Sequence, residues 1–231
     1  MAILYGSRIT SLASDNFSYN PSRGKLIWRC LSENQQIALD RFYQDSNGQN
    51  WESPYGNNPT EGWFVVDENS VVYMASVLGY SGPETFTQFF PGSVNFSGVI
   101  PDSIGSLNSL TQLLLFGNPN LVSPLPESLA NLTALEYLNL NDNGLSGSIP
   151  GFLGSLTQLK RLYLEENDFS GEIPAELGQL TNLEDLEVNG NQLTGELPAS
   201  LGNLTSLKEL EIFNNQISGA VPASFSNLTA L

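Results

Sequence analysis

The chain has 231 residues, 40% of them hydrophobic, which suffices to bury the core of one large or two small domains. Eight basic residues against 24 acidic ones leave a net charge of −16, which argues against binding to nucleic acid or to anionic membrane surfaces, because both depend on lysine and arginine. There is no histidine, which excludes Ser-His and Cys-His nucleophile pairs, and the single cysteine, Cys30, can form no intrachain disulfide.

Residues 1–31 show no sustained hydrophobic period and are interpreted as a poorly ordered leader. Within them, Lys25-Leu26-Ile27-Trp28 predicts a short strand. The apolar run Ile3-Leu4-Tyr5 is too short for a signal peptide, and no run of 18 apolar residues predicts a membrane span. The compartment therefore stays open.

Residues 32–80 predict an N-terminal cap made of a helix and a hairpin. Ser32-Glu33-Asn34-Gln35 matches a capping box at a helix start. Residues 63–66 and 71–78 predict two strands joined by the turn 67–70. Trp51 and Trp63 are interpreted as core residues of this cap rather than as ligand-stacking groups.

Residues 107–231 repeat one phrase five times and begin a sixth. Residues 81–106 end in a recognisable repeat tail and are interpreted as a degenerate first repeat, the alternative being an insertion between cap and array. Prolines mark the period, with spacings of 25, 24, 24, 24 and 24 residues at Pro101, Pro126, Pro150, Pro174, Pro198 and Pro222. Such a period predicts a solenoid. Because the array would be capped at one end only, we expect the sequence to be a fragment of a longer chain.

Each repeat position has a predicted task. Leu135, Leu138 and Leu140 alternate so that their side chains point inward from a strand. A polar residue buried at every turn needs a partner, which predicts a structural ladder of asparagine amides at Asn118, Asn143, Asn167, Asn191 and Asn215. Recurring prolines predict extended and 3₁₀ segments on the far side instead of full helices. The repeat from Leu107 has one extra residue at Asn118-Pro119-Asn120-Leu121, which predicts a local bulge.

The phrase LxxLxxLxLxxNxLxGxIPxxLGx resembles the plant-type leucine-rich repeat of receptor-like ectodomains and polygalacturonase-inhibiting proteins. The resemblance implies an α/β solenoid, a right-handed superhelix with a parallel concave sheet and a helix-plus-hairpin N-terminal cap. That cap usually carries a cysteine pair, and none lies between Trp51 and Val77, which favours a protist, algal, bacterial or intracellular relative. By resemblance, an extracellular or cell-surface location is slightly favoured over others.

Outward residues of the strands form four columns on the concave face, and they are the candidate ligand-binding surface. Carboxylates dominate from Glu165 to Glu211, and aromatic residues recur among them. The candidate binding residues are Phe116, Tyr137, Arg161, Tyr163, Glu165, Asp185, Glu187, Glu209, Glu211 and Phe213. The columns also include Leu114, Asn139, Asn141, Asn189 and a fourth line of Gly117, Asp142, Glu166, Gly190 and Asn214. Two interpretations stay open: an acidic groove for a basic peptide or protein, and a solvated face without a ligand.

These observations leave three candidate functions. The first is a non-enzymatic protein- or peptide-binding module, the ligand-sensing part of a receptor-like protein. The alternatives are a secreted inhibitor of a carbohydrate-degrading enzyme, by resemblance alone, and an intracellular scaffold attached to a signalling domain. We expect no catalytic residue, cofactor or metal site, because an open repetitive surface buries carboxylates too little to tune them. Sequons begin at Asn95, Asn131, Asn203 and Asn227, and they fit either N-glycosylation or the repeat's own phrase.

Overall fold

In the computed structural model, the described residues are 97–108 and 110–231, together with the backbone of seven strands before them. These strands are β1 (Ala2–Tyr5), β2 (Arg8–Ser11), β3 (Phe17–Asn20), β4 (Lys25–Trp28), β5 (Phe64–Val66), β6 (Val72–Met74) and β7 (Gln88–Phe89). The helix predicted after Ser32, the core roles of Trp51 and Trp63, and the sequon at Asn95 lie outside the described residues.

The strands before residue 88 form antiparallel pairs. β5 and β6 make a hairpin where the sequence predicts one, with Val65 opposite Tyr73. β4 occupies the four residues expected for a strand and pairs with β3. The pairing of β1 with β5 gives the sheet order β2-β1-β5-β6, so part of the expected leader contributes strands to the hairpin's sheet, which the sequence does not predict. The division of the chain into leader, cap and repeats stays a prediction.

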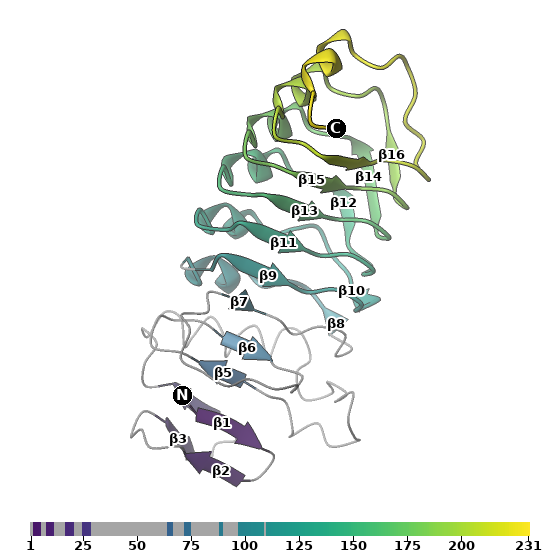
Figure 1. Cartoon of the computed structure of the whole chain (residues 1–231). Coiled ribbons are helices and arrows are strands. Elements are labelled where there is room, and N and C mark those ends of the chain that lie inside the picture. The colour runs from purple at the N-terminus through teal and green to yellow at the C-terminus, as the bar shows by residue number, and fades with distance from the viewer. Residues whose placement is uncertain are drawn as a thin grey trace.

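The repeats coil into a solenoid whose concave face is a parallel sheet of six strands, β17-β15-β13-β11-β9-β7 (Figure 1). Its members after β7 are β9 (Gln112–Leu114), β11 (Tyr137–Asn139), β13 (Arg161–Tyr163), β15 (Asp185–Glu187) and β17 (Glu209–Glu211). The register follows the 24-residue period, since Tyr137 faces Arg161 and Arg161 faces Asp185. Gln88 faces Gln112 in the same way, so the degenerate segment already supplies a strand to this sheet.

The side opposite the concave sheet carries short 3₁₀ helices instead of α-helices, as the recurring proline predicts. They are η2 (Asp102–Ser106), η3 (Glu127–Asn131), η4 (Gly151–Ser155), η5 (Ala175–Gln179), η6 (Ala199–Asn203) and η7 (Ala223–Asn227). A proline precedes each one, and its carbonyl accepts the first i→i+3 bond, as from Leu129 N–H to Pro126 O at 3.1 Å. Proline cannot donate a backbone hydrogen bond, which makes it suitable for the start of a helix.

A second, lateral sheet joins β12 (Ser146–Ser148), β14 (Asp168–Glu172) and β16 (Gln192–Thr194). It is interrupted at the irregular repeat, where β10 (Asn120–Leu121) pairs with β8 (Ser97–Gly98) in a separate two-stranded sheet. The extra residue also changes the ladder, because Asn143 Oδ1 there accepts from Asn118 N–H itself at 2.9 Å. In the next repeat, Asn167 Oδ1 accepts from Leu145 N–H, two residues beyond the preceding asparagine. The bulge is therefore present.

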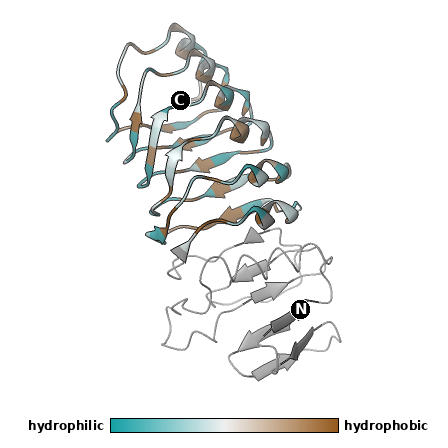
Figure 2. Cartoon of the chain, turned by 180° about the vertical axis from the view of Figure 1, so that it is seen from behind, coloured by the Kyte–Doolittle hydropathy of each residue, from teal (hydrophilic) through white to brown (hydrophobic). Residues whose placement is uncertain are grey.

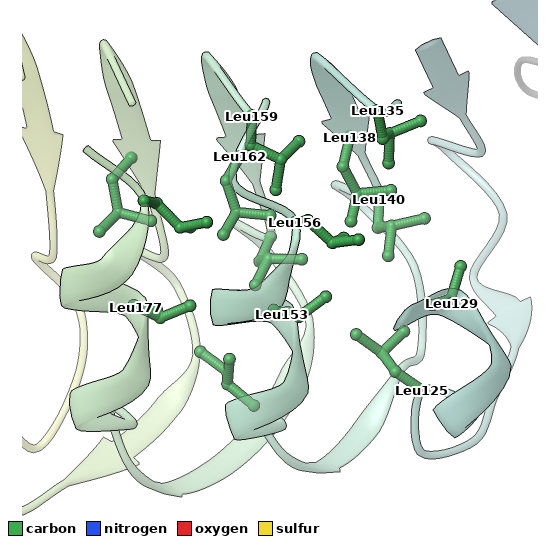
Figure 3. Close-up of a cluster of buried hydrophobic side chains, with 14 of the residues drawn as sticks. Leu125, Leu129, Leu135, Leu138, Leu140, Leu153, Leu156, Leu159, Leu162 and Leu177 are labelled. Atoms are coloured by element: carbon green, nitrogen blue, oxygen red, sulfur yellow. The ribbon is translucent and has the colours of Figure 1, made fainter. Parts of the chain in front are cut away.

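The core lies between the concave strands and the 3₁₀ helices, and every coil contributes the same leucine positions to it. Figure 3 shows Leu159 and Leu162 on the strand side of the interior with Leu153 opposite them on the helix side, and all three are fully buried. Figure 2 shows hydrophobic and hydrophilic segments alternating along each coil. Since each coil buries its leucines against the neighbouring coils, the fold holds the concave strands in a rigid register.

Candidate functional site

The concave sheet brings most of the predicted binding residues onto one surface, because its strands are in register. One column contains Tyr137, Arg161, Asp185 and Glu209, and the next contains Tyr163, Glu187 and Glu211. Neighbouring rungs are about 4.8 Å apart, so side chains on adjacent rungs can touch. Phe116 and Phe213 are exposed toward the two ends of the array.

Tyr137, Arg161, Tyr163 and Asp185 form one connected cluster, the Arg161 cluster. The two tyrosine rings meet edge to face with centroids 5.3 Å apart, and the Arg161 guanidinium lies 5.8 Å from the Tyr137 centroid. Arg161 Nε donates to Asp185 Oδ2 at 3.0 Å, and the Tyr163 hydroxyl donates to the same oxygen at 3.4 Å. Burial raises the pKa of Tyr163, so its hydroxyl stays a donor at neutral pH. The polar groups of the Arg161 cluster are therefore paired with one another.

The carboxylates beside the Arg161 cluster are not paired in this way. Burial, followed by repulsion from the surrounding carboxylates, raises the pKa of Glu187 from 4.5 to about 7. Burial also raises the pKa of Glu165, although a hydrogen bond from Asn141 Nδ2 to Glu165 Oε1, 2.7 Å long, opposes that shift. The repelling groups around Glu187 are Glu165, Glu211, Glu209 and Asp185. We call Glu165, Glu187, Glu209 and Glu211 the acidic cluster.

No basic residue of the repeats neutralises the acidic cluster. Residues 97–231 contain three basic residues, and each is engaged with a carboxylate outside the cluster. Arg161 pairs with Asp185, while Lys160 Nζ and Lys208 Nζ each lie 2.7 Å from Glu136 and Glu184 respectively. The bond from Lys208 lowers the pKa of Glu184. Within residues 97–231, none of these ion pairs involves the acidic cluster.

Some side chains that the alternation places outward are in fact buried, which corrects the expectation of four exposed columns. Leu114, Asn139 and Asn189 are only 5%, 8% and 6% exposed. Asn139 is held by its own chain segment, because its Oδ1 accepts from Asn141 N–H, two residues further on, at 3.0 Å. The strand pattern gives the direction of a side chain but not the neighbouring side chains, and these neighbours cover the three positions. Asn141 and Asn189 lie on the rungs on either side of Glu165, and neither was chosen as a binding residue, although their shared column was a signal in the sequence.

The fourth column serves the turn that leaves each concave strand. Its members share a left-handed backbone, with φ between 51° and 71°, at Gly117, Asp142, Glu166, Gly190 and Asn214. Three of them are not glycine, and side chains are strained in this region. The column is thus a conformational feature of the coil.

The ladder asparagines lie inside the solenoid. Asn167, for example, donates from Nδ2 to Leu140 O of the preceding coil at 2.9 Å and to Leu164 O of its own coil at 3.2 Å. Asn143, Asn191 and Asn215 make the equivalent pair of bonds. Asn118 donates from Nδ2 to Phe116 O at 2.8 Å. These amides satisfy backbone carbonyls and are turned away from any ligand.

The sequon asparagines at 131, 203 and 227 are exposed, each at the last residue of a 3₁₀ helix and away from the concave strands. Among the described residues, no group of three or more acidic or sulfur ligands is placed to hold a metal ion. In the same part of the chain, no helix has the length and apolar character needed to cross a membrane.

The family described as the leucine-rich repeat region matches residues 95–231. No curated protein matches the chain. Among solved structures, the chain is similar to the ectodomain of the plant membrane receptor kinase GASSHO1/SCHENGEN3 from Arabidopsis thaliana, solved in complex with CASPARIAN STRIP INTEGRITY FACTOR 2. The identity is 36% and the TM-score 0.60, over 62% of this chain and 17% of that one.

Two further structures are similar. One is the complex PEPR1-AtPEP1, with 29% identity and a TM-score of 0.69 over 87% of this chain and 27% of that one. The other is a plant ice-binding protein, with 28% identity and a TM-score of 0.65 over 84% of this chain and 60% of that one. The chain thus spans about a sixth of the GASSHO1/SCHENGEN3 chain and about a quarter of the chain in PEPR1-AtPEP1.

Proposed function

Because the chain belongs to the leucine-rich repeat proteins, we propose that its concave face is a non-enzymatic binding surface for a basic protein or peptide segment. The similar ectodomain of the plant receptor kinase GASSHO1/SCHENGEN3 was solved in complex with CASPARIAN STRIP INTEGRITY FACTOR 2, which supports a ligand-binding role for these repeats. A ligand-sensing part of a receptor-like protein is the context that this similarity favours.

The observation that carries the proposal is the acidic cluster itself, whose glutamates lie on adjacent rungs with no ion pair among the described residues, and the raised pKa of Glu187 agrees with it. Its value of about 7 reflects both burial and repulsion among neighbouring carboxylates, which is an electrostatic cost within the free protein. A positively charged ligand would remove part of that cost on binding, whereas an acidic one would increase it. Electrostatic complementarity of this kind steers association and selects among partners.

Aromatic side chains give the same surface apolar contact area. Tyr163 is half-buried in the middle of the sheet, and Phe213 is 55% exposed two rungs further on. Tyrosine and phenylalanine are enriched in the central parts of protein interfaces. A basic segment lying along the concave sheet would meet rings as well as carboxylates.

The proposal is tested by selecting binders from a displayed library of random peptides on the whole chain. We expect the recovered peptides to be enriched in arginine and lysine, and their affinity to fall as ionic strength rises. The double variant Glu187→Gln/Glu211→Gln should weaken the best of them by about tenfold or more, since hydrogen bonds to charged groups contribute about 1.5–3 kcal/mol each.

A matched control removes the same charge elsewhere. Glu172 and Glu196 are exposed and belong to the lateral side of the coils, so Glu172→Gln/Glu196→Gln should leave the affinity nearly unchanged. Recovery of acidic or neutral peptides, or an equal loss of affinity in both double variants, would refute a basic ligand on the concave face. Tyr163→Ala combined with Glu187→Lys should abolish binding while the chain stays folded.

A further inference from the structure

Three consecutive rungs of the concave face carry a hydrogen-bond acceptor that has no donor. Asn141, Glu165 and Asn189 follow each other at 24-residue intervals, and backbone bonds link their rungs, from Asp142 N–H to Glu165 O and from Glu166 N–H to Asn189 O. Asn141 Oδ1, Glu165 Oε2 and Asn189 Oδ1 are all buried and unpaired. We call these three residues the acceptor column.

The unpaired atoms of the acceptor column are amide and carboxylate oxygens, which accept hydrogen bonds and do not donate them. Asn141 Nδ2 donates to Glu165 Oε1 at 2.7 Å, which leaves Asn141 Oδ1 on the other side of the amide. An ionised carboxylate has acceptors only. Asn189 is 6% exposed, so solvent has little access to its amide oxygen. A buried polar group without a partner costs about 1–3 kcal/mol, and the missing partner must be a donor.

The charge around the acceptor column adds an independent requirement. Glu165 lies among the carboxylates that raise the pKa of Glu187, and the three basic residues of the repeats are engaged elsewhere. The column therefore calls for a cation, and a basic protein segment would supply one that is rich in N–H donors.

Resting on the basic ligand proposed above, we propose that the acceptor column is a subsite for the guanidinium group of an arginine side chain in the bound segment. Guanidinium is planar, carries five N–H donors and accepts nothing, so its two edges can serve acceptors on adjacent rungs about 4.8 Å apart. The ammonium group of lysine has three donors that diverge from one atom, and it cannot serve three acceptors set in a row as well.

The neighbouring rung supplies a surface for the flat face of the group. Phe213 follows Asn189 in the same column and is 55% exposed. Arginine stacks on aromatic rings as well as donating at its edges. The three acceptor atoms are covered in the free protein, while Asn141 and Glu165 keep part of their surface exposed, so a ligand arriving from the concave side reaches the acceptors when these side chains turn toward it.

The test compares three synthetic peptides on the whole chain. One alternates glycine with arginine, the second replaces arginine by lysine, and the third replaces it by citrulline, which keeps the shape but not the charge. We expect the arginine peptide to bind about ten times more tightly than the lysine peptide, and the citrulline peptide to bind far more weakly than either. Isothermal titration calorimetry measures the three dissociation constants.

Two variants test whether the acceptor column causes the preference for arginine over lysine. Glu165→Gln removes the charge while keeping an acceptor for Asn141, and Asn189→Leu removes an acceptor at similar volume. Each should reduce the preference for arginine over lysine to about threefold or less, and their melting curves should show folded protein. The control Glu172→Gln, on the lateral sheet, should retain the full preference.

The outcomes separate this inference from the function on which it rests. If arginine and lysine peptides bind equally while Glu187→Gln weakens both, the basic ligand stands and the guanidinium subsite is overturned. If Glu165→Gln and Asn189→Leu both keep the full preference for arginine, the subsite is likewise overturned. If neither basic peptide binds better than the citrulline peptide, the proposed function itself is refuted.

Discussion

Replacing Asn191 by alanine tests the asparagine ladder at a position that bonds to the preceding coil through both of its amide atoms. Asn191 is 8% exposed, and its Oδ1 accepts from Phe169 N–H at 3.0 Å. Its Nδ2 donates to three carbonyl oxygens, at distances of 2.9 to 3.2 Å, on Leu164, Val188 and Asn189.

The cost of the substitution follows from which of these groups keeps another partner. All three carbonyl oxygens retain a second donor, namely Asn167 Nδ2, Asn215 Nδ2 and Glu166 N–H respectively. Phe169 N–H loses the side-chain acceptor given for it and lies in a residue with no exposed surface. One buried donor is therefore left without a partner.

An unpaired buried N–H costs about 1–3 kcal/mol, and the cavity left by the amide adds on the order of 1 kcal/mol. We expect Asn191→Ala to lower the free energy of unfolding by about 2–4 kcal/mol in urea denaturation followed by circular dichroism.

Asn182→Ala is the matched control, because Asn182 is exposed and makes one bond, to Thr157 O at 2.9 Å. Its effect should stay below about 0.5 kcal/mol. Asn215→Ala should fall between the two, since Asn215 is more exposed than Asn191. Equal losses for Asn191→Ala and Asn182→Ala would refute the ladder as a source of stability.

Three further changes probe the electrostatics and backbone. The folded state binds more protons than the unfolded state between pH 4.5 and about 7, because the pKa of Glu187 is raised, so the free energy of unfolding falls as pH rises through this window. Glu187→Gln should flatten that fall in urea denaturation on either side of the window. Glu166→Gly should raise the free energy of unfolding by up to about 1 kcal/mol, since φ at Glu166 is 51° and left-handed strain is removed. Gly178→Ala should lower it by about 1–3 kcal/mol, because the new Cβ would overlap the backbone oxygen of Ser200.

Each of these changes has a control. An unchanged pH dependence in Glu187→Gln would show that other groups cause the fall. Glu176→Gly, in a 3₁₀ helix with ordinary φ, should destabilise, and a similar loss in Glu166→Gly would contradict the strain at residue 166. In Gly151→Ala the nearest atom is Glu176 Oε2 at 3.0 Å, at the end of a flexible side chain, so its loss should be smaller than that of Gly178→Ala.

Most of the solenoid could be predicted from the sequence. The spacing of Leu135, Leu138 and Leu140 determined which side chains face inward, and the proline period predicted 3₁₀ helices where η2 to η7 occur. The extra residue near Asn118 predicted a local bulge, and the lateral sheet is interrupted at that repeat. These features depend on residues close together in the chain, repeated at a constant interval, so the local pattern suffices to predict them.

The strands before the repeats illustrate where this reasoning fails. β1 pairs with β5 across about 60 residues, with Ala2 opposite Val66, and no period connects the two segments. A pairing between distant, non-repeating segments leaves no signal in either strand alone, which is why residues 1–31 were interpreted as a leader.

The candidate binding surface was also predictable from the sequence only in part. The sequence alone determined which residues share a column of the concave face, because the register equals the repeat length. Only the tertiary structure decided what those residues do there. The burial of Asn189, the raised pKa of Glu187 and the pairing of Arg161 with Asp185 depend on side chains one or more rungs away. Burial and charge depend on several neighbouring coils together. The pattern of one strand gives the position of a side chain, but it does not show which groups surround that side chain.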